Sequence, residues 1–472
     1  MDTETLIIGG RAVATTATAA VTNPYSGEVI ARVPQADHDQ VLDAIAAART
    51  AFATFRHWPA HRRAGLCAGV AHGIAQARDE LGHLITAEAG KPITQALAEV
   101  DRAVSTFTIA AEEAKRLAGE AIPADVTAAG EGYTALTRRV PVGPISAIAP
   151  FNFPLNLVAH KLAPALAAGC TVVLKPPVQA PLTALRLGRI VHDAGAPDGV
   201  FQVVPCGVEA ARPLITDERM TMLSFTGSDR VGWHLKGICG KKRVALELGG
   251  NAAAVVCADA DLDAAAGRIA FGAFAYAGQI CISVQRILVQ EDVYEPFVAA
   301  LVKATEALPV GDPAAFKTVV GPLIDGAAAD RVTAWIAEAT AAGARLLSGG
   351  TRAGNVVRPT LLAGVTPGMK VCCAEVFGPV ATVQPFATFE DAVRMVNDSP
   401  YGLQAGVFTT NLRHALYAHR HMEVGGVVVG DIPTLRFDHA PYGGSKDSGL
   451  GREGVRYAME EMTEPRLLLI KE

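Results

Sequence analysis

The amino-acid sequence has 472 residues, of which 50% are hydrophobic, and its formal net charge is −5. This length is sufficient for two or three domains with large apolar cores. The slightly acidic balance disfavours binding to nucleic acid or to an anionic membrane surface, because both require a basic face.

The sequence also lacks the patterns of secretion and membrane insertion. Residues 1–5 carry no positive charge, and the apolar run that follows them is too short for a signal core. The longest apolar stretch, residues 162–174, is interrupted by Pro164 and Gly169 and is too short to cross a bilayer. A cytoplasmic protein is therefore predicted.

The cysteines indicate free thiols. There are eight, none of them in a CxxC pattern, and without a secretory signal they are not expected to form disulfides. Cys372 and Cys373 are adjacent, but no histidine or second cysteine pair stands near them at the spacing of metal ligands. No metal site is predicted.

Three helices are predicted ahead of the first strands. Apolar residues fall at helical spacing over residues 37–53 and 61–88, with charged residues on the opposite face. Gly90 and Pro92 end the second helix, and a third is predicted over residues 93–117.

From residue 141 the pattern changes to short apolar runs bounded by glycine and proline. Runs rich in valine and isoleucine that alternate with helices indicate a parallel sheet built from βαβ units. The predicted strands are residues 145–149, 171–174, 200–204, 222–225 and 244–248, with helices at 157–168 and 181–194.

A second alternating block follows Asn251. Its predicted strands are residues 253–257, 286–290, 380–386, 405–409 and 426–429, and its helices are 262–275, 293–307 and 327–342. Two successive α/β domains, each with a parallel sheet, are therefore predicted, and Glu247 and Cys281 lie on either side of their junction. A cleft between two domains is a common place for an active site.

Two further strands belong to neither block. Residues 131–140 alternate in polarity, and residues 466–470 form an apolar run that is too hydrophobic to remain at a surface. Either an oligomer interface or a strand folded back on its own domain would account for them.

Cys281 and Glu247 are the strongest candidates for catalysis. A thiol can attack a carbonyl carbon, and a carboxylate can activate the water that releases the product. Glu247 ends a short apolar run just before Gly249 and Gly250, where a carboxylate is costly unless it is paired or has a raised pKa. The alternatives are a buried core cysteine and a structural salt bridge.

Polar residues also follow three of the predicted strands, where α/β sheets bind ligands. Asn152 could donate to a developing oxyanion, or it could cap the helix that follows. Lys175 could reach a ribose hydroxyl or a phosphate. Gly227 and Ser228 open a helix in a position suited to phosphate, although the GxGxxG and Walker patterns are absent.

These motifs, together with others downstream, are found in order over nearly the whole chain and resemble the aldehyde dehydrogenase superfamily. The matching segments are residues 150–154 (PFNFP), 175–176 (KP), 225–228 (FTGS), 247–250 (ELGG), 278–281 (GQIC), 375–379 (EVFGP) and 441–449 (PYGGSKDSG).

The resemblance implies covalent catalysis. Cys281 would be the nucleophile, Glu247 the general base in deacylation, and Asn152 with the backbone NH of Cys281 the oxyanion hole. The intermediate would be a thioester that water hydrolyses to a carboxylic acid.

The resemblance implies NAD or NADP as the cofactor. Lys175 would bind the adenosine ribose, Ser228 the pyrophosphate and Glu375 the nicotinamide ribose. NAD-preferring members often carry glutamate three residues after the lysine, where this chain has Val178, so the preference stays open. The residues implied at the cofactor are Phe151, Lys175, Pro177, Gly227, Ser228, Gly232, Glu375 and Phe377.

The implied fold has three parts and commonly forms homodimers or homotetramers. Residues 1–117 and 140–248 would form a Rossmann-like cofactor domain, residues 249–440 the catalytic domain, and residues 118–139 with 461–472 a small β oligomerisation flap.

The substrate is predicted to be a small polar or anionic aldehyde. The resemblance is to the branch that handles lactaldehyde, glyceraldehyde phosphate, succinate semialdehyde and phosphono- or sulfo-aldehydes. Ile280 stands where phosphate-recognising members have arginine. The residues predicted to line the substrate site are Arg102, Phe153, Ile280, Ile282, Arg436 and His439.

Three alternatives accompany this prediction. Arg102 and Arg436 could form surface ion pairs instead of binding substrate. CoA could replace water as the acyl acceptor, although Glu247 argues against that. A thiol hydrolase without cofactor is the alternative from another class, but no histidine is linked by motif to Cys281.

Overall fold

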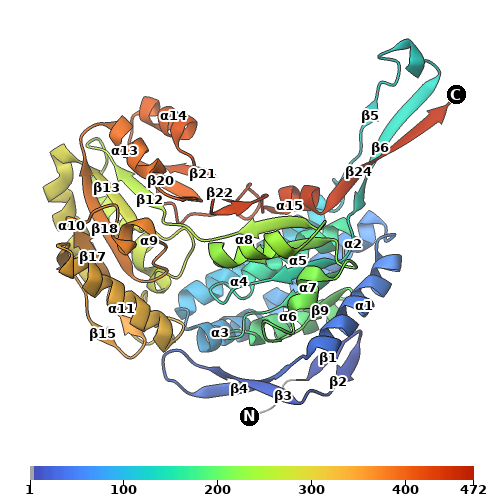
Figure 1. Cartoon of the computed structure of the whole chain (residues 1–472), viewed down its shortest axis with the longest axis horizontal. Coiled ribbons are helices and arrows are strands. Elements are labelled where there is room, and N and C mark those ends of the chain that lie inside the picture. The colour runs from blue at the N-terminus through green and yellow to red at the C-terminus, as the bar shows by residue number, and fades with distance from the viewer. Residues whose placement is uncertain (1–4) are drawn as a thin grey trace.

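The computed structural model describes residues 5–472 and contains two large sheets that lie in separate lobes (Figure 1). The first sheet has six strands in the order β23-β11-β10-β7-β8-β9. Their bounds are β7 Ile145–Ile148, β8 Val172–Lys175, β9 Phe201–Val203, β10 Met222–Thr226, β11 Arg243–Glu247 and β23 Gly449–Leu450. Neighbouring strands are parallel except β23, which pairs antiparallel with β11. The parallel order places the ends of β7, β8, β10 and β11 on one edge.

The helices of this lobe bury their apolar faces against the sheet and against one another. The helix α1 begins with a capping box between Asp37 and Gln40, which satisfies backbone groups at its first turn. All residues of α5 are buried, so this helix forms the centre of the lobe. The bounds are α1 His38–Phe55, α2 Ala60–Gln76, α3 Arg78–Ala89, α4 Ile93–Glu113, α5 Asn156–Ala168, α6 Leu182–Asp193, α7 Arg212–Thr216, α8 Asp229–Ile238 and α15 Val455–Glu461.

The prediction of one continuous helix over residues 61–88 is wrong. The segment forms two helices, α2 and α3, which meet at Ala77, whose backbone (φ −92°, ψ 15°) leaves the helical region. No glycine or proline marks the break, so the helical spacing of apolar residues continued through it. Packing against other helices, and not local sequence, sets this break.

The second sheet has seven strands in the order β14-β17-β18-β13-β12-β20-β21, and only β14 runs antiparallel to its neighbour. The strands are β12 Ala253–Val256, β13 Arg286–Gln290, β14 Arg345–Ser348, β17 Thr360–Ala363, β18 Val380–Phe386, β20 Gln404–Phe408 and β21 Gly426–Val429. Its helices are α9 Leu262–Phe274, α10 Tyr294–Glu306, α11 Gly326–Ala341, α12 Lys370–Cys373, α13 Phe389–Asn397 and α14 Leu412–His421. The prediction of two α/β units with largely parallel sheets is confirmed.

A three-stranded antiparallel sheet extends away from both lobes as an arm (Figure 1). It consists of β5 Ala121–Ile122, β6 Tyr133–Pro141 and β24 Thr463–Lys471, and β6 pairs with β24 over nine residues. The side chains of Leu467, Leu468, Leu469 and Ile470 on β24 are all exposed. Among residues 5–472 nothing covers these apolar side chains.

Several short elements were not predicted. Two antiparallel hairpins precede α1, and small strands connect the larger elements. Their bounds are β1 Leu6–Ile8, β2 Arg11–Val13, β3 Ala17–Thr22, β4 Val29–Gln35, β15 Arg352–Ala353, β16 Val356–Val357, β19 Tyr401–Gly402 and β22 Ser445–Lys446, with short 3-10 turns at Ala128–Gly130, Ala275–Gly278 and Glu291–Val293. Across residues 5–472 the helices are all too short or too polar to span a membrane.

Candidate active site

Cys281 and Glu247 come together because the backbone of Gly250, three residues after Glu247, lies against that of Cys281. Glu247 is the last residue of β11, and the chain then turns so that a side chain at Gly250 would lie 2.7 Å from the carbonyl oxygen of Cys281. Only glycine permits this approach. Cys281 itself follows a left-handed turn at Tyr276 and Ala277 (φ 52° and 54°), a backbone conformation that residues other than glycine rarely adopt.

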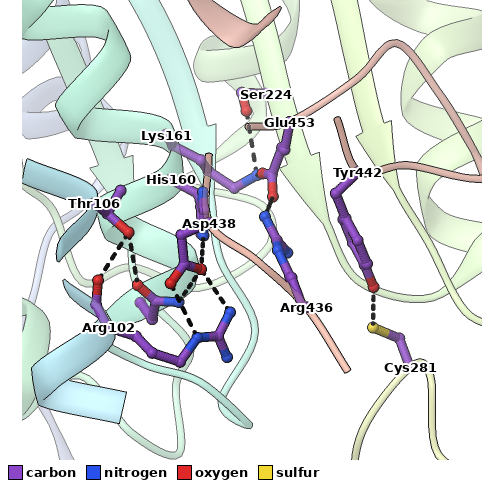
Figure 2. A network of polar contacts seen from close by, with 11 residues as sticks. Arg102, Thr106, His160, Lys161, Ser224, Cys281, Arg436, Asp438, Tyr442 and Glu453 are labelled. Carbon is purple, nitrogen blue, oxygen red and sulfur yellow. Dashed lines mark hydrogen bonds and ion pairs between the residues drawn. The ribbon is translucent and has the colours of Figure 1, made fainter. Parts of the chain in front are cut away.

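The sulfur of Cys281 has one hydrogen-bond partner within the described chain, Tyr442. Sγ lies 3.1 Å from the Tyr442 hydroxyl (Figure 2). Burial raises the pKa of the Cys281 thiol to about 11, and the Tyr442 hydrogen bond opposes that rise. The thiol is therefore largely protonated at neutral pH, and it would need help to ionise before it could act as a nucleophile.

Asn152 lies beside Cys281 and does not cap a helix. Its side-chain nitrogen donates to the carbonyl oxygen of Gln279 at 2.9 Å, whereas α5 begins after Leu155 with no side-chain cap from Asn152. The backbone NH of Cys281 donates to no other described residue. The N-cap alternative for Asn152 is wrong, and the remaining NH of its amide and the NH of Cys281 are available as donors near the sulfur.

A buried carboxylate that the sequence analysis missed supports the Asn152 loop. Glu99 accepts hydrogen bonds from the backbone NH groups of Leu155 (2.9 Å) and Asn156 (3.0 Å), and so caps α5 from α4. Its other oxygen pairs with buried Lys91, whose ammonium lies 3.4 Å from the centre of the Phe153 ring. Glu99 and Lys91 thus fix the segment that carries Asn152 and Phe153.

Glu247 is buried with one carboxylate oxygen, Oε2, lacking any hydrogen-bond partner in residues 5–472. Burial and then the nearby charge of Glu453 raise its pKa well above the ordinary value, and Arg436, Lys161 and Arg452 oppose that rise. A buried carboxylate with a raised pKa and a free oxygen is suited to accept a proton from water.

Arg436 and Glu453 form a buried pair close to Tyr442 (Figure 2). Arg436 Nη2 donates to Glu453 Oε2 at 2.9 Å, and its guanidinium lies 3.8 Å from the centre of the Tyr442 ring. Lys161 also pairs with Glu453 at 3.3 Å and donates to Ser224. The buried Nε of Arg436 has no partner among the described residues.

Arg102 belongs to a second cluster, on the side of Arg436 that faces away from Tyr442 and Cys281 (Figure 2). It forms a two-point ion pair with Asp438, with distances of 2.7 and 3.2 Å. Asp438 also accepts from His160 Nε2 at 2.8 Å. Burial and then Arg436 lower the pKa of His160 to about 4, so this histidine is neutral at physiological pH. About a third of the Arg102 side chain, 31%, is exposed.

The predicted apolar throat is only partly assembled around the sulfur. Ile282 packs with Leu403 and Tyr442 in a small buried cluster that Ile280 and Cys281 border. Phe153 lies 5.8 Å from the Arg102 guanidinium. His439 is exposed on the segment that carries Arg436, and its ring lies 6.2 Å from that of Phe437.

The residues implied for the cofactor lie along one edge of the first sheet. Lys175 ends β8, and its side-chain ammonium has no hydrogen bond or ion pair to another described residue. Ser228 is the N-cap of α8 without a side-chain cap bond, and the buried Thr226 hydroxyl beside it has no partner in residues 5–472. A free ammonium, an orphan hydroxyl and an uncapped helix amino terminus fit a dinucleotide with its ribose and pyrophosphate.

Glu375 completes this arrangement from the second lobe. It is partly buried, accepts from the backbone NH of Gly250 at 3.0 Å, and has its pKa raised to about 7 by desolvation. Phe151 and Phe377 meet edge to face, with 5.9 Å between ring centres. Gly227 lies in the turn before α8, Gly232 packs on Leu248, Pro177 is buried in the loop after β8, and Val178 is exposed.

Comparison with known proteins decides the family. A model of the aldehyde dehydrogenase family matches residues 12–468. The chain belongs to the aldehyde dehydrogenase family. A 3-sulfolactaldehyde dehydrogenase of Priestia megaterium is 43% identical over 451 residues, which cover 95% of this chain and 94% of the relative. Membership makes the chain an NAD(P)-dependent oxidoreductase of aldehydes.

Solved structures of other aldehyde dehydrogenases share the fold. Aldehyde dehydrogenase 21 of Physcomitrella patens, solved with its product succinate, superposes with a TM-score of 0.97 at 42% identity, covering 99% of this chain and 98% of the other. GapN of Methanocaldococcus jannaschii, a glyceraldehyde-3-phosphate dehydrogenase solved with NADP, gives 0.92 at 38%, covering 96% and 99%. An NAD-dependent enzyme of Sinorhizobium meliloti is also similar, so either cofactor occurs among such neighbours.

Sequence analysis of this aldehyde dehydrogenase missed the supporting groups of the site. Tyr442, Glu453, Lys161 and Asp438 were not among the predicted site residues. Tyr442 lies within the PYGG motif, where a hydroxyl next to two glycines was an available signal. The others gave no local signal, because their role depends on partners far away in the chain.

Proposed function

We propose that this aldehyde dehydrogenase oxidises a small anionic or hydroxylated aldehyde to its carboxylate through a thioester on Cys281. The Cys281 thiolate attacks the carbonyl carbon, and the amide of Asn152 with the backbone NH of Cys281 stabilises the oxyanion that forms. Glu247 then removes a proton from the water that attacks the thioester, and Cys281 leaves as thiolate. NAD or NADP, when bound, supplies the hydride acceptor for the oxidation.

The cofactor is assigned to Lys175 and Ser228, whose side chains have no partner among the described residues, and to Glu375, which the Gly250 NH orients. Lys175 would bind the adenosine ribose, Ser228 and the first turn of α8 the pyrophosphate, and Glu375 the nicotinamide ribose. The remaining residues proposed to shape the cofactor site are Phe151, Pro177, Gly227, Gly232 and Phe377. Val178 offers no carboxylate to a ribose 2′-hydroxyl, so the proposal leaves both NAD and NADP open.

The proposed substrate class rests on the buried Nε of Arg436, which has no hydrogen-bond partner among the described residues. Its guanidinium covers the Tyr442 ring at 3.8 Å, and the hydroxyl of that ring lies 3.1 Å from Cys281 Sγ. A buried N–H with no acceptor is costly, and a substrate anion would satisfy it. Sulfolactaldehyde, succinate and glyceraldehyde 3-phosphate, named for three of the similar proteins, are all small and anionic.

Arg102 is proposed as the second cationic group. Both of its bonded nitrogens already face Asp438, so its charge is largely neutralised. A bidentate pair still leaves Nη1 for a ligand. Phe153, Ile280, Ile282 and His439 are proposed to line the remainder of the substrate site.

The direct test is a panel of short aldehydes with NAD and NADP, followed by absorbance at 340 nm. Succinate semialdehyde and 3-sulfolactaldehyde should be oxidised with a higher kcat/KM than butanal or pentanal, which carry neither a charge nor a hydroxyl group. Cys281→Ala should abolish all production of reduced cofactor. A preference for the neutral aldehydes would overturn the substrate class, and residual full activity of Cys281→Ala would overturn the mechanism.

Variants of the arginines test the anion site separately. Arg436→Lys retains the charge that pairs with Glu453 but loses Nε, so it should lower kcat/KM about ten- to hundredfold for the anionic aldehyde and little for butanal. Arg102→Gln should show the same selectivity with a smaller factor. The proposal fails if both substrates lose activity equally in a variant that keeps the wild-type melting temperature.

The acyl acceptor is proposed to be water and not CoA, because Glu247 supplies the base that hydrolysis requires. Addition of CoA to a turnover assay should leave the carboxylate as product. Formation of acyl-CoA would place the chain among the CoA-acylating members.

The division into domains and the assembly are proposed on the same basis. Residues 1–117 and 140–248 contain all strands of the first sheet except β23 and would bind the cofactor, and residues 249–440 contain the second sheet and the proposed nucleophile. Residues 118–139 and 461–472 form the arm, whose exposed leucines favour a homodimer or homotetramer in which a second copy covers them.

A further inference from the structure

Three contacts hold the ring of Tyr442 in one position. Its backbone pairs with that of Glu453 through two hydrogen bonds of 3.0 and 2.7 Å, and Glu453 in turn pairs with Arg436. Arg436 completes this set of contacts, because its guanidinium lies 3.8 Å from the centre of the Tyr442 ring. Because Tyr442 is only 6% exposed, its hydroxyl has little freedom to turn away from the Cys281 sulfur.

The charges that face the Cys281 sulfur are of both signs. Glu375 and Glu247 disfavour a thiolate, and Arg436 favours it, in addition to the effect of burial. Within the described chain the Tyr442 hydroxyl is the one hydrogen-bond partner of the sulfur. A thiolate in this environment therefore depends on a single neutral donor.

We propose that Tyr442 is a further catalytic residue, whose hydroxyl donates a hydrogen bond to the Cys281 thiolate and so increases the fraction of ionised nucleophile. The inference rests on the proposed role of Cys281 as nucleophile. The cation over the ring withdraws electron density from the phenol and makes its hydroxyl a better donor.

The protonation state of Tyr442 agrees with this role. Burial, and then the nearby Cys281, raise the pKa of Tyr442 well above its ordinary value. The phenol therefore keeps its proton at neutral pH and can donate it in a hydrogen bond to the sulfur. When the sulfur attacks the carbonyl carbon it ceases to be an anion, and the hydroxyl is released to bond to other acceptors in the site.

The test is the pH dependence of Cys281 alkylation by iodoacetamide without cofactor or substrate. The thiolate displaces iodide, a carbon–sulfur bond forms, and the thiol proton goes to solvent, so the rate follows the ionised fraction. Alkylation must be read for the Cys281 peptide by mass spectrometry, because Cys373 is exposed and will also react. Tyr442→Phe removes one oxygen and keeps the ring beneath Arg436, and Tyr294→Phe on α10 serves as the matched control.

In Tyr442→Phe the midpoint of Cys281 alkylation should move up by about one to two pH units, as expected for the loss of a hydrogen bond to a charged group. Tyr294→Phe should retain the wild-type midpoint. The kcat/KM of Tyr442→Phe for aldehyde oxidation should fall at least tenfold at pH 7 and recover as the pH rises. An unchanged alkylation midpoint in a variant with the wild-type melting temperature would overturn the inference.

Failure of the proposed function would give a different result. If Cys281→Ser continued to oxidise aldehydes at the wild-type rate, Cys281 would not be the nucleophile, whatever the alkylation midpoint of Tyr442→Phe. The two outcomes come from separate variants and separate measurements.

Discussion

The side-chain nitrogen of Asn152 lies 2.9 Å from the carbonyl oxygen of Gln279. Asn152 follows the first strand of the six-stranded sheet, whereas Gln279 precedes Cys281 in the lobe of the seven-stranded sheet. The contact therefore fixes a donor from one lobe near Cys281, the proposed nucleophile, in the other. The amide has a second N–H that this bond leaves free.

Asn152→Ala should lower kcat about 10²- to 10³-fold, the usual effect of removing one oxyanion donor. KM should change less, because the donor acts mainly on the charge that develops during attack. Steady-state kinetics with the best aldehyde of the panel measures both. Asn152→Asp retains the shape without the donor and should be equally impaired, so high activity in Asn152→Asp would contradict the assignment.

Glu99→Gln should lower the free energy of unfolding by about 3–5 kcal/mol, because the buried ammonium of Lys91 loses its partner. Burial lowers the pKa of Lys91 to about 8 even with Glu99 present. In the variant, Lys91 should therefore lose its proton at a still lower pH. Because a neutral amine needs no charged partner, the destabilisation should diminish as the pH rises. Urea unfolding at several pH values measures this change.

Glu80→Gln is the matched control for Glu99→Gln. Glu80 pairs with Arg186 at the surface, where more than half of its side chain is exposed, so its loss should cost about 0–1 kcal/mol. Equal destabilisation by the two variants would show that the Lys91–Glu99 pair does not have the role assigned to it.

Glu247 should give hydrolysis of the thioester a dependence on pH. Since its pKa is raised, the carboxyl is protonated over a wider range of low pH, and only the ionised form can accept a proton from water. The decay of the acyl-enzyme, followed by intact mass after rapid mixing, should therefore slow as the pH falls through that raised pKa. Glu247→Gln should accumulate acyl-enzyme and lose this pH dependence, and a slope that persisted in the variant would assign the base elsewhere.

Val178→Glu should shift the enzyme towards NAD. The side chain of Val178 is 46% exposed in the loop after Lys175, so a carboxylate can be accommodated there without cost to the core. It would bind a ribose 2′-hydroxyl and repel a 2′-phosphate. The ratio of kcat/KM for NAD to that for NADP should rise about tenfold or more, an effect of at least 1.4 kcal/mol.

Val126→Glu is the control for charge alone, because Val126 is 80% exposed and lies in the arm. It should leave the cofactor ratio unchanged. A wild-type ratio in Val178→Glu would place the ribose away from this loop.

Leu467→Asp with Leu469→Asp should dissociate the assembly. Both side chains are 56% exposed on β24, and an aspartate there cannot be buried against a second copy without a large desolvation penalty. Light scattering after size-exclusion chromatography should report the mass of one chain for the double variant and a multiple of it for the wild type. A wild type that already runs as a monomer would remove the role assigned to the arm.

The sequence by itself determined the architecture and the ends of the strands. Alternation of apolar runs with helical spacing gave the strands β7, β8, β10 and β11 within a residue or two, and hence the placement of Lys175 and Glu247 at their carboxyl ends. These features are local, because the period of apolar residues and the positions of glycine are set by the residues themselves. The break at Ala77 was missed because no local residue marks it.

Only the tertiary structure decided which side chains meet at Cys281. Tyr442 reaches the sulfur, Arg436 covers Tyr442, and Glu99 holds the Asn152 loop, although each pair is separated in sequence or belongs to different elements. Such contacts depend on how two sheets and their connecting segments pack. A shift of one residue in a strand would bring different side chains into contact. The sequence therefore determined that a thiol and a carboxylate lie near the junction of two domains. The packing of those domains determined the pKa of the thiol and of the carboxylate.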